Sequence, residues 1–280
     1  MGNPKLYTLI TGASHGIGMA FCHEFANRGH NLFIVALPDK RLSSVEKDLK
    51  EKYEVSILAM GIDLTQENAA KSVYNFALTN GIGINHLINN AGMGSGGLFV
   101  NSNNELNAHI MRLNNQAMVE LTHIFLPSLI EEAPSYILNM SSMEATLPLP
   151  YKSVYTATKN FIYSFSLALS EELKPHKVKI SIVCPGAVLT NEDGLKRIES
   201  MGWRARLLLK MPEDVASFAI KQMYKGKRVI IPGIVPLLII RIMHFLPLSL
   251  KMKILEKIFR NYKDHDHVRI NETEILETNR

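Results

Sequence analysis

Apolar and polar positions alternate along this chain with two periods, and these periods predict its architecture. Short apolar runs are separated by longer segments whose apolar residues recur with helical spacing. Strands are predicted at 6–11, 31–36, 55–60, 85–89, 136–140, 178–183 and 228–231. Helices are predicted at 16–28, 40–52, 66–80, 105–132, 151–174 and 212–225. Strands that alternate with helices imply right-handed crossovers, so we predict an α/β fold with a doubly wound parallel sheet of about seven strands flanked by helices.

The pattern changes after Pro232. Residues 234–250 are strongly apolar, but two prolines and the polar Arg241 and His244 interrupt them, so they do not form a span of about twenty residues. Residues 250–263 have the spacing of a basic amphipathic helix. Such a helix can lie on an anionic bilayer, or it can cover the protein's own core or a second subunit, which is the interpretation we favour. Residues 264–280 are polar and are predicted to form a frayed tail.

Composition narrows the class of protein. The 280 residues are 46% hydrophobic and 20% charged, as in a globular domain. The net charge of +5 permits attraction to acidic surfaces without identifying a partner, and no nucleic-acid partner is expected. Cys22 and Cys184 have no metal-binding spacing, so we expect buried, reduced thiols and no metal site. The first residues lack the pattern of a secretory signal, so the expected location is cytoplasmic, at a membrane periphery if 234–263 bind lipid.

A glycine-rich segment follows the first predicted strand. The residues from Thr11 to Gly18 read Thr-Gly-Ala-Ser-His-Gly-Ile-Gly and open a predicted helix. Gly12 permits a tight turn, and Gly16 and Gly18 permit close approach of the backbone to a ligand and of the helix to the strand. The free N–H groups of the first helical turn then face a pyrophosphate. A glycine turn without a ligand is the alternative.

The ends of the next strands bear on the choice of coenzyme. The second strand ends in Ala36, followed by Leu37 and Pro38, so no carboxylate stands where it would repel a 2′-phosphate. His15, Lys40 and Arg41 offer positive charge, whereas Asp39 could bind a ribose diol. This favours NADP over NAD by a small margin. The same residues 39–41 are equally well explained as a solvated helix start.

Two further turns are suited to a bound nucleotide. Asp63 and Leu64 follow the third strand, where a carboxylate can accept a hydrogen bond from the adenine amino group. The segment Asn89–Gly92 ends the fourth strand, and its small residues suit a backbone that passes under a cofactor. Taken alone, each is also compatible with an ordinary turn.

Residues that can move a proton lie between 114 and 159. Ser142 follows the fifth strand, and Tyr155 and Lys159 are four residues apart on a predicted helix, so they share one face. A nearby ammonium stabilises a phenolate, so we expect Lys159 to lower the pKa of Tyr155. Together Ser142 and Tyr155 would supply two hydrogen-bond donors to one oxygen that develops negative charge.

In these motifs the chain resembles the short-chain dehydrogenase/reductase family, in its compact single-domain branch. The resemblance covers about residues 6–232 and implies a Rossmann-type dinucleotide-binding catalytic domain over 1–232, with 233–263 as a helical extension. It also implies roles for four residues: Tyr155 as general acid or base, Lys159 as its partner that also holds the nicotinamide ribose, Ser142 as a donor to the substrate carbonyl, and Asn114 as the holder of a water that links Lys159 to solvent. Asn115 is the rival for the last role.

The resemblance also implies the cofactor contacts and the partners. Cofactor-binding residues are expected to be Gly12, Ser14, His15, Gly16, Ile17, Gly18, Asp63, Leu64, Asn90, Ala91, Gly92, Tyr155, Lys159, Pro185, Gly186, Val188 and Thr190. A lid is expected at about 191–211, where Trp203 lies among leucines, and a plain packing helix is the alternative. A homodimer or homotetramer would pair the helices at 105–132 and 151–174.

The predicted function is therefore an NAD(P)(H)-dependent oxidoreductase that interconverts a secondary alcohol and a ketone. The apolar lid and the extension favour a lipophilic substrate, such as an acyl chain or a steroid-like carbonyl compound. The alternative is a catalytically silent nucleotide-binding regulator or scaffold with the same fold.

Overall fold

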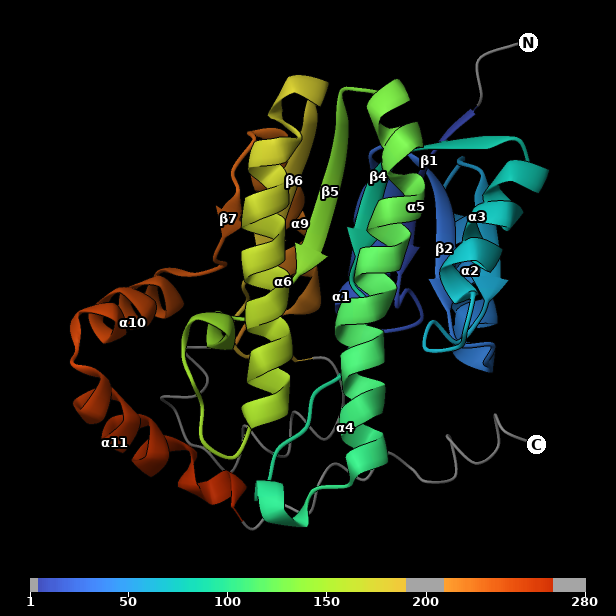
Figure 1. The fold of residues 1–280 in the computed structure, drawn as a ribbon. Coiled ribbons are helices and arrows are strands. Elements are labelled where there is room, and N and C mark those ends of the chain that lie inside the picture. Colours follow the sequence, from blue (N-terminus) through green and yellow to red (C-terminus); the bar gives the residue numbers. More distant parts are fainter. Residues whose placement is uncertain (1–4, 190–208, 264–280) are drawn as a thin grey trace.

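Seven parallel strands form the centre of the protein, in a computed structural model that describes residues 5–189 and 209–263 (Figure 1). Their order across the sheet is β3-β2-β1-β4-β5-β6-β7, so the chain starts in the middle and winds outward twice. The strands are β1 (Lys5–Thr11), β2 (Asn31–Ala36), β3 (Ile57–Gly61), β4 (Ile82–Asn89), β5 (Ser135–Met140), β6 (Val178–Val183) and β7 (Val229–Ile230). The predicted Rossmann-type fold is confirmed.

Helices cover both faces of this sheet and bury its apolar strands. One core lies between the sheet and α1 (Gly16–Asn27), α2 (Lys40–Lys52) and α9 (Pro212–Tyr224). The other lies beneath α3 (Ala69–Thr79), α5 (Ala117–Glu131) and the end of α6 (Ser153–Glu172). Short helical turns are η1 (Phe99–Asn101), η3 (Met143–Thr146) and η4 (Lys174–His176). Because every strand is parallel, Thr11, Asn89 and Met140 meet at one edge of the sheet, where the chemistry was predicted.

The helix predicted at 105–132 is not continuous. It consists of α4 (Asn104–Met111), a π-helical turn η2 (Arg112–Gln116) and α5. Side-chain periodicity did not show this break, because one extra residue in a helical turn barely changes the apolar spacing. Such π turns occur often at functional sites, and this one contains Asn114.

Several predicted boundaries also shift by a few residues. The helix predicted to begin at 66 begins at Ala69, because Asn68 adopts a left-handed conformation with φ of 60°. The fourth strand begins three residues earlier than predicted, at Ile82. Thr190, most of the predicted lid at 191–211 and the tail at 264–280 lie outside the described residues.

The C-terminal extension comprises α10 (Ile234–Phe245), α11 (Leu248–Phe259) and the turn η5 (Arg260–Tyr262). Pro247 separates the two helices, since the residue before a proline disfavours helical geometry. Met243 and Leu255 pack against Leu147 and Leu149 of the loop after β5. Figure 1 shows the extension beside the end of the molecule where the strands terminate. In the described part of the chain, no helix combines the length and apolarity that crossing a bilayer requires.

Candidate active site

The glycine turn between β1 and α1 has the geometry expected of a phosphate-binding loop. Gly12 and Gly16 have φ of 65° and 55°, in the left-handed region that favours glycine. A Cβ on Gly18 would lie 1.9 Å from the Gly12 carbonyl oxygen, so helix and turn touch through backbone alone. No side chain caps the start of α1 at His15. The turn therefore presents backbone N–H groups at a helix N-terminus, which fits a pyrophosphate.

Hydrogen bonds fix this turn to the end of β4. The Thr11 hydroxyl oxygen accepts from the backbone N–H groups of Asn90 and Ala91, both at 3.0 Å. In return the Asn90 amide donates to the carbonyls of Thr11 at 2.9 Å and Gly12 at 3.2 Å. Sequence reasoning gave Thr11 no role. A hydroxyl at the end of an otherwise apolar strand was the signal that could have indicated one.

The groups expected near the adenosine make local contacts. Asp39 accepts from the Leu42 N–H at 3.0 Å as the cap of α2, and it pairs with Arg41 at 2.9 Å. Burial acts to raise the pKa of Asp39, but these hydrogen bonds and the Arg41 charge hold it below its usual value. Asp63 accepts three hydrogen bonds from Thr65 and Gln66, and Leu64 behind it is buried.

Ser142, Tyr155 and Lys159 converge, although Tyr155 and Lys159 follow Ser142 by thirteen and seventeen residues. The Ser142 side chain lies beside the Tyr155 phenol and interacts with it. The Lys159 ammonium donates to the Met140 carbonyl at 2.9 Å and lies 5.9 Å from the centre of the Tyr155 ring. Gly94 leaves room for that ring, because a Cβ there would lie 3.3 Å from two of its carbons.

The electrostatics of this group differ from the sequence-based expectation. Burial raises the pKa of Tyr155 above its usual value, the Glu144 carboxylate adds to the rise, and the hydrogen bond with Ser142 opposes it. Burial lowers the pKa of Lys159 to about 8. Lys159 therefore does not dominate the pKa of Tyr155, because desolvation of the phenol outweighs an ammonium that is itself desolvated. At neutral pH Tyr155 is protonated, as a proton donor must be.

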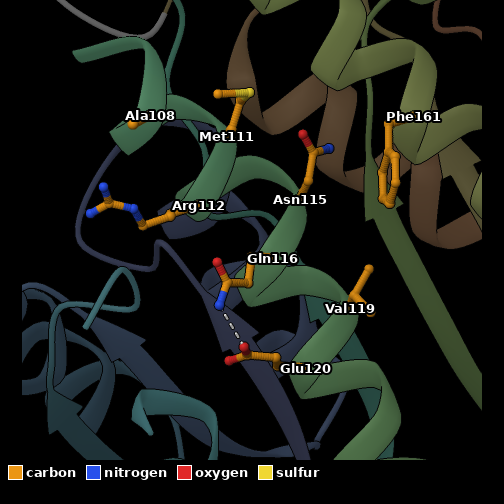
Figure 2. A pocket seen from close by; sticks show the side chains of 8 residues that line it. All are labelled: Ala108, Met111, Arg112, Asn115, Gln116, Val119, Glu120 and Phe161. Atoms are coloured by element: carbon orange, nitrogen blue, oxygen red, sulfur yellow. Dashed lines mark hydrogen bonds between the residues drawn. The ribbon is translucent and has the colours of Figure 1, made fainter. Parts of the chain in front are cut away.

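Asn114, rather than Asn115, faces this group. Its side chain exchanges two hydrogen bonds of 2.9 Å with the backbone of Met93 and donates to the Thr158 hydroxyl at 3.0 Å. At Gly92 a Cβ would lie 3.0 Å from the Asn114 oxygen and 3.3 Å from the Lys159 nitrogen. Gly92 thus allows the chain to pass over both. Asn115 instead donates to the Thr158 carbonyl and lines a separate hollow with Met111 and Phe161 (Figure 2).

The segment expected at the nicotinamide follows β6. The Pro185 carbonyl accepts from the Met143 N–H at 2.9 Å, which joins this segment to the turn that carries Ser142. Gly186 follows it, and Val188 forms a parallel bridge with Lys210. Of the predicted cofactor residues only Thr190 lies outside the described chain; Ser14 lies in the glycine turn, and Ile17 lies in the first turn of α1. The glycine turn, the braced Asn90–Gly92 segment and Lys159 thus border one region that fits a dinucleotide.

A cluster of side chains that covers Tyr155 was not predicted. The Lys152 ammonium pairs with Glu144 at 2.9 Å and lies over the rings of Tyr155, Phe259 and Tyr262, at 5.6, 5.6 and 4.6 Å from their centres. Tyr262 also packs against the backbone of Gly96, where a Cβ would lie 3.0 Å from its ring. No local pattern joins residues 152 and 262, so only tertiary packing shows this contact. Among the described residues, no cluster of His, Cys, Asp and Glu could hold a metal ion.

Comparison with known proteins agrees with this geometry. The family described as short chain dehydrogenase matches residues 7–199. Over 179 residues the chain is 32% identical to a very-long-chain 3-oxoacyl-CoA reductase of Laccaria bicolor, a match that covers 62% of this chain and 52% of that protein. The enzyme of the same name from Bos taurus is 29% identical over 195 residues, with 68% and 62% covered. The chain thus spans about half to three-fifths of the length of these relatives.

Solved structures agree as well. A short-chain dehydrogenase from Sphingobium yanoikuyae in complex with NADPH is 28% identical, with a TM-score of 0.71 over 88% of this chain and 97% of that one. L-sorbose reductase from Gluconobacter frateurii, complexed with NADPH and L-sorbose, is 26% identical, with a TM-score of 0.73 over 81% and 94%. The family resemblance and the enzyme class inferred from the sequence are confirmed. The chain belongs to the short-chain dehydrogenase family.

Proposed function

We propose that this protein is an NAD(P)(H)-dependent oxidoreductase that interconverts a secondary alcohol and a ketone, with reduction of a lipophilic carbonyl compound as its main direction. One observation carries the proposal. The Ser142 side chain lies beside the Tyr155 phenol and interacts with it, and the Lys159 ammonium lies 5.9 Å from the centre of the phenol ring. Two donors can therefore reach one carbonyl oxygen, which is what an alkoxide-forming reaction requires.

Each residue has a distinct task in this mechanism. A nicotinamide cofactor, when bound, supplies the hydride to the carbonyl carbon. Ser142 donates a hydrogen bond to the carbonyl oxygen, and Tyr155 transfers its proton to that oxygen as negative charge develops there. Lys159 stabilises the resulting phenolate by its positive charge. Asn114 holds the Gly92–Met93 backbone beside Lys159, along the path by which the phenolate would regain a proton through water.

For the cofactor we propose NADP in preference to NAD. The turn after β2 has no carboxylate at Ala36, Leu37 or Pro38. Asp39, the acidic residue that follows, is engaged by Arg41 and by the start of α2. The Sphingobium and Gluconobacter enzymes named above contain NADPH. Comparison of NADPH and NADH oxidation at equal concentrations tests the preference.

For the substrate we propose an acyl-chain or steroid-like ketone. The Laccaria and Bos taurus relatives are named as reductases of very-long-chain 3-oxoacyl-CoA, which contains a ketone on a long apolar chain. The apolar extension packs next to the loop that carries Ser142, so an apolar wall borders the reacting group. A series of 3-oxo compounds of increasing chain length would show KM falling with length.

The proposal extends to partners and location. We propose self-association through the side of the molecule formed by α4, η2 and α6, where Met111 and Phe161 are about half-exposed around the hollow in Figure 2. We also propose that residues 234–263 contact a membrane, in a cytoplasmic protein at the membrane periphery.

Replacing Tyr155 with Phe tests the reaction. Turnover of NADPH with a reactive ketone should fall by about 10²- to 10⁴-fold, because the phenol is the general acid, while NADPH binding persists. Tyr74→Phe on α3, remote from the site, is the matched control and should keep full turnover. Undiminished turnover in Tyr155→Phe would overturn the mechanism. A wild-type protein that binds NADPH yet oxidises none across a broad ketone panel would instead support the silent regulator.

A further inference from the structure

The C-terminal extension exposes an unusual amount of apolar surface. Half of the sixteen exposed large hydrophobic side chains in the described part of the chain lie between residues 234 and 258. The most exposed is Phe245, at 89%, followed by Ile234 at 75% and Leu248 at 66%. Contiguous apolar surface of this kind marks an interaction site in a protein that otherwise buries its apolar residues.

The helix α10 is apolar on two opposite faces. Pro236, Ile240 and Met243, spaced by four and three residues, are buried against the protein. Ile234, Leu238, Ile242 and Phe245 follow the same spacing on the other side and are exposed. One face therefore accounts for packing on the protein's own core and leaves the second face without a partner in the described structure. A helix that is apolar all round is otherwise found in a protein core or in a membrane.

The charge of the extension indicates whether a second copy of the chain or an anionic bilayer covers that second face. Residues 234–263 contain six Lys or Arg residues and one Glu, a formal net charge of +5 that equals that of the whole chain. Two copies of this surface would repel each other, whereas an anionic bilayer would attract it. Lys253 and Lys257 line a hollow with Arg260, and within the described residues neither lysine has an ion-pair partner.

The length of α10 determines whether the extension could cross a bilayer or only lie on it. The twelve residues of α10 extend about 18 Å, well short of the roughly 30 Å hydrocarbon core. Pro247 then turns the chain into α11. The following turn, η5, places Tyr262 beside Lys152, which also lies over the Tyr155 ring. The extension can therefore lie on a membrane but not cross it, with its inner face still attached to the Ser142 loop.

We propose that α10 and α11 form a docking surface for an anionic lipid bilayer. Ile242, Phe245 and Leu248 at the α10–α11 corner enter the interface, and Lys253, Lys257 and Arg260 contact lipid phosphates. This names the surface and the lipid charge for the membrane contact in the proposed function. Docking would place the proposed active site next to the bilayer, in which a lipophilic substrate dissolves. Membrane binding does not depend on turnover.

Flotation of the full-length protein with vesicles tests the proposal. The protein should float with phosphatidylcholine vesicles that contain phosphatidylglycerol and bind at least about tenfold less to pure phosphatidylcholine. Phe245→Ser with Leu248→Ser should lower binding to the anionic vesicles by about tenfold or more, because two exposed apolar side chains are lost. The matched control, Phe99→Ser with Leu78→Ser, removes the same pair of exposed side chains elsewhere and should bind like the wild type.

Two outcomes would overturn the proposal. The first is equal flotation of the wild type with neutral and anionic vesicles, and the second is unchanged flotation of Phe245→Ser/Leu248→Ser. If the oligomer mass of that variant also changes while its flotation does not, the face is assigned to a second copy of the chain. Circular dichroism confirms that the variants fold. NADPH turnover with a water-soluble ketone in the absence of vesicles is measured alongside, so loss of docking and loss of the proposed reaction are read separately.

Discussion

Among single residues, Glu144 has the largest effect on the pKa of Tyr155. Its carboxylate pairs with Lys152, and both side chains are more than four-fifths buried. Its backbone N–H donates to the Ser142 hydroxyl oxygen at 3.1 Å. After burial, its charge is the next largest influence that raises the pKa of Tyr155. The part-buried Glu144 carboxylate therefore makes Tyr155 less acidic, because charges separated by little water interact strongly.

Glu144→Gln should make Tyr155 more acidic. Removal of the carboxylate takes away a contribution that raises the Tyr155 pKa. In the proposed mechanism Tyr155 is the base in alcohol oxidation, so the rising limb of the pH–rate profile should move to lower pH. Oxidation at a pH below that limb should accelerate, by about tenfold for each unit by which the pKa falls.

The control for this variant is Glu46→Gln on α2, which breaks a comparable ion pair with Lys50 at 2.6 Å, away from the site. It should leave the limb in place. If the rising limb of the pH–rate profile does not shift in Glu144→Gln, or shifts to higher pH, the carboxylate does not raise the Tyr155 pKa.

The β1–α1 turn is the element on which the proposed cofactor binding depends. Its glycines serve different purposes. Gly12 and Gly16 have left-handed backbone angles, whereas Gly18 does not and is required for space alone. The motif was predicted because each requirement is local: a strand, a tight turn and a helix start follow one another in sequence. The hydrogen bonds from Asn90 that hold the turn come from about eighty residues away.

Gly18→Ala should weaken cofactor binding. The new methyl group would lie 1.9 Å from the Gly12 carbonyl oxygen, so the turn must move. We expect NADPH affinity to fall by more than about tenfold and stability to fall by about 1–3 kcal/mol, as for other overpacked contacts. Fluorescence titration with NADPH and urea unfolding measure the two effects.

Gly81→Ala is the companion variant. Gly81 has φ of 62° and open space around it, so it should lose about 1–2 kcal/mol through backbone strain and keep its NADPH affinity. If Gly18→Ala bound NADPH as tightly as Gly81→Ala does, close packing at the turn would be irrelevant to the cofactor.

A buried histidine cluster links distant parts of the whole molecule at the amino-terminal edge of the sheet. The Tyr224 hydroxyl lies 3.1 Å from ring nitrogens of both His30 and His86. His86 also stacks on Tyr136, with ring centres 5.0 Å apart. Burial, and the nearby His30, lower the pKa of His86 to about 3. The cluster joins α9 to β4 and β5, so its protonation affects the fold as a unit.

Stability should consequently fall in acid. Between pH 6.5 and about 3 the unfolded chain binds a proton at His86 that the folded chain does not, so lower pH favours unfolding. His86 alone contributes a loss of about 1.4 kcal/mol per pH unit once the pH is well below 6.5, and none above it. Urea unfolding from pH 7.5 to 4.5 measures the slope.

His86→Gln should be less stable at pH 7.5 but should show a shallower slope, because Gln does not take up a proton. Replacing the exposed His123 with Gln should leave the slope as it is in the wild type. The same steep slope in His86→Gln would assign the acid sensitivity to other groups.

The sequence alone determined the features that neighbouring residues specify. Apolar periodicity gave the strand and helix order, and with it the doubly wound sheet; the glycine turn, Tyr155 with Lys159 and the strand-ending Ser142 indicated the chemistry. The fold prediction succeeded because its physical requirements extend over at most a few turns of chain. Tertiary structure alone decided that Asn114 lies in a π turn, that the Glu144 carboxylate raises the Tyr155 pKa, and that α10 packs one apolar face and exposes the other. Those facts depend on which distant residues share a contact, and burial and charge at such contacts are set only when the chain has folded.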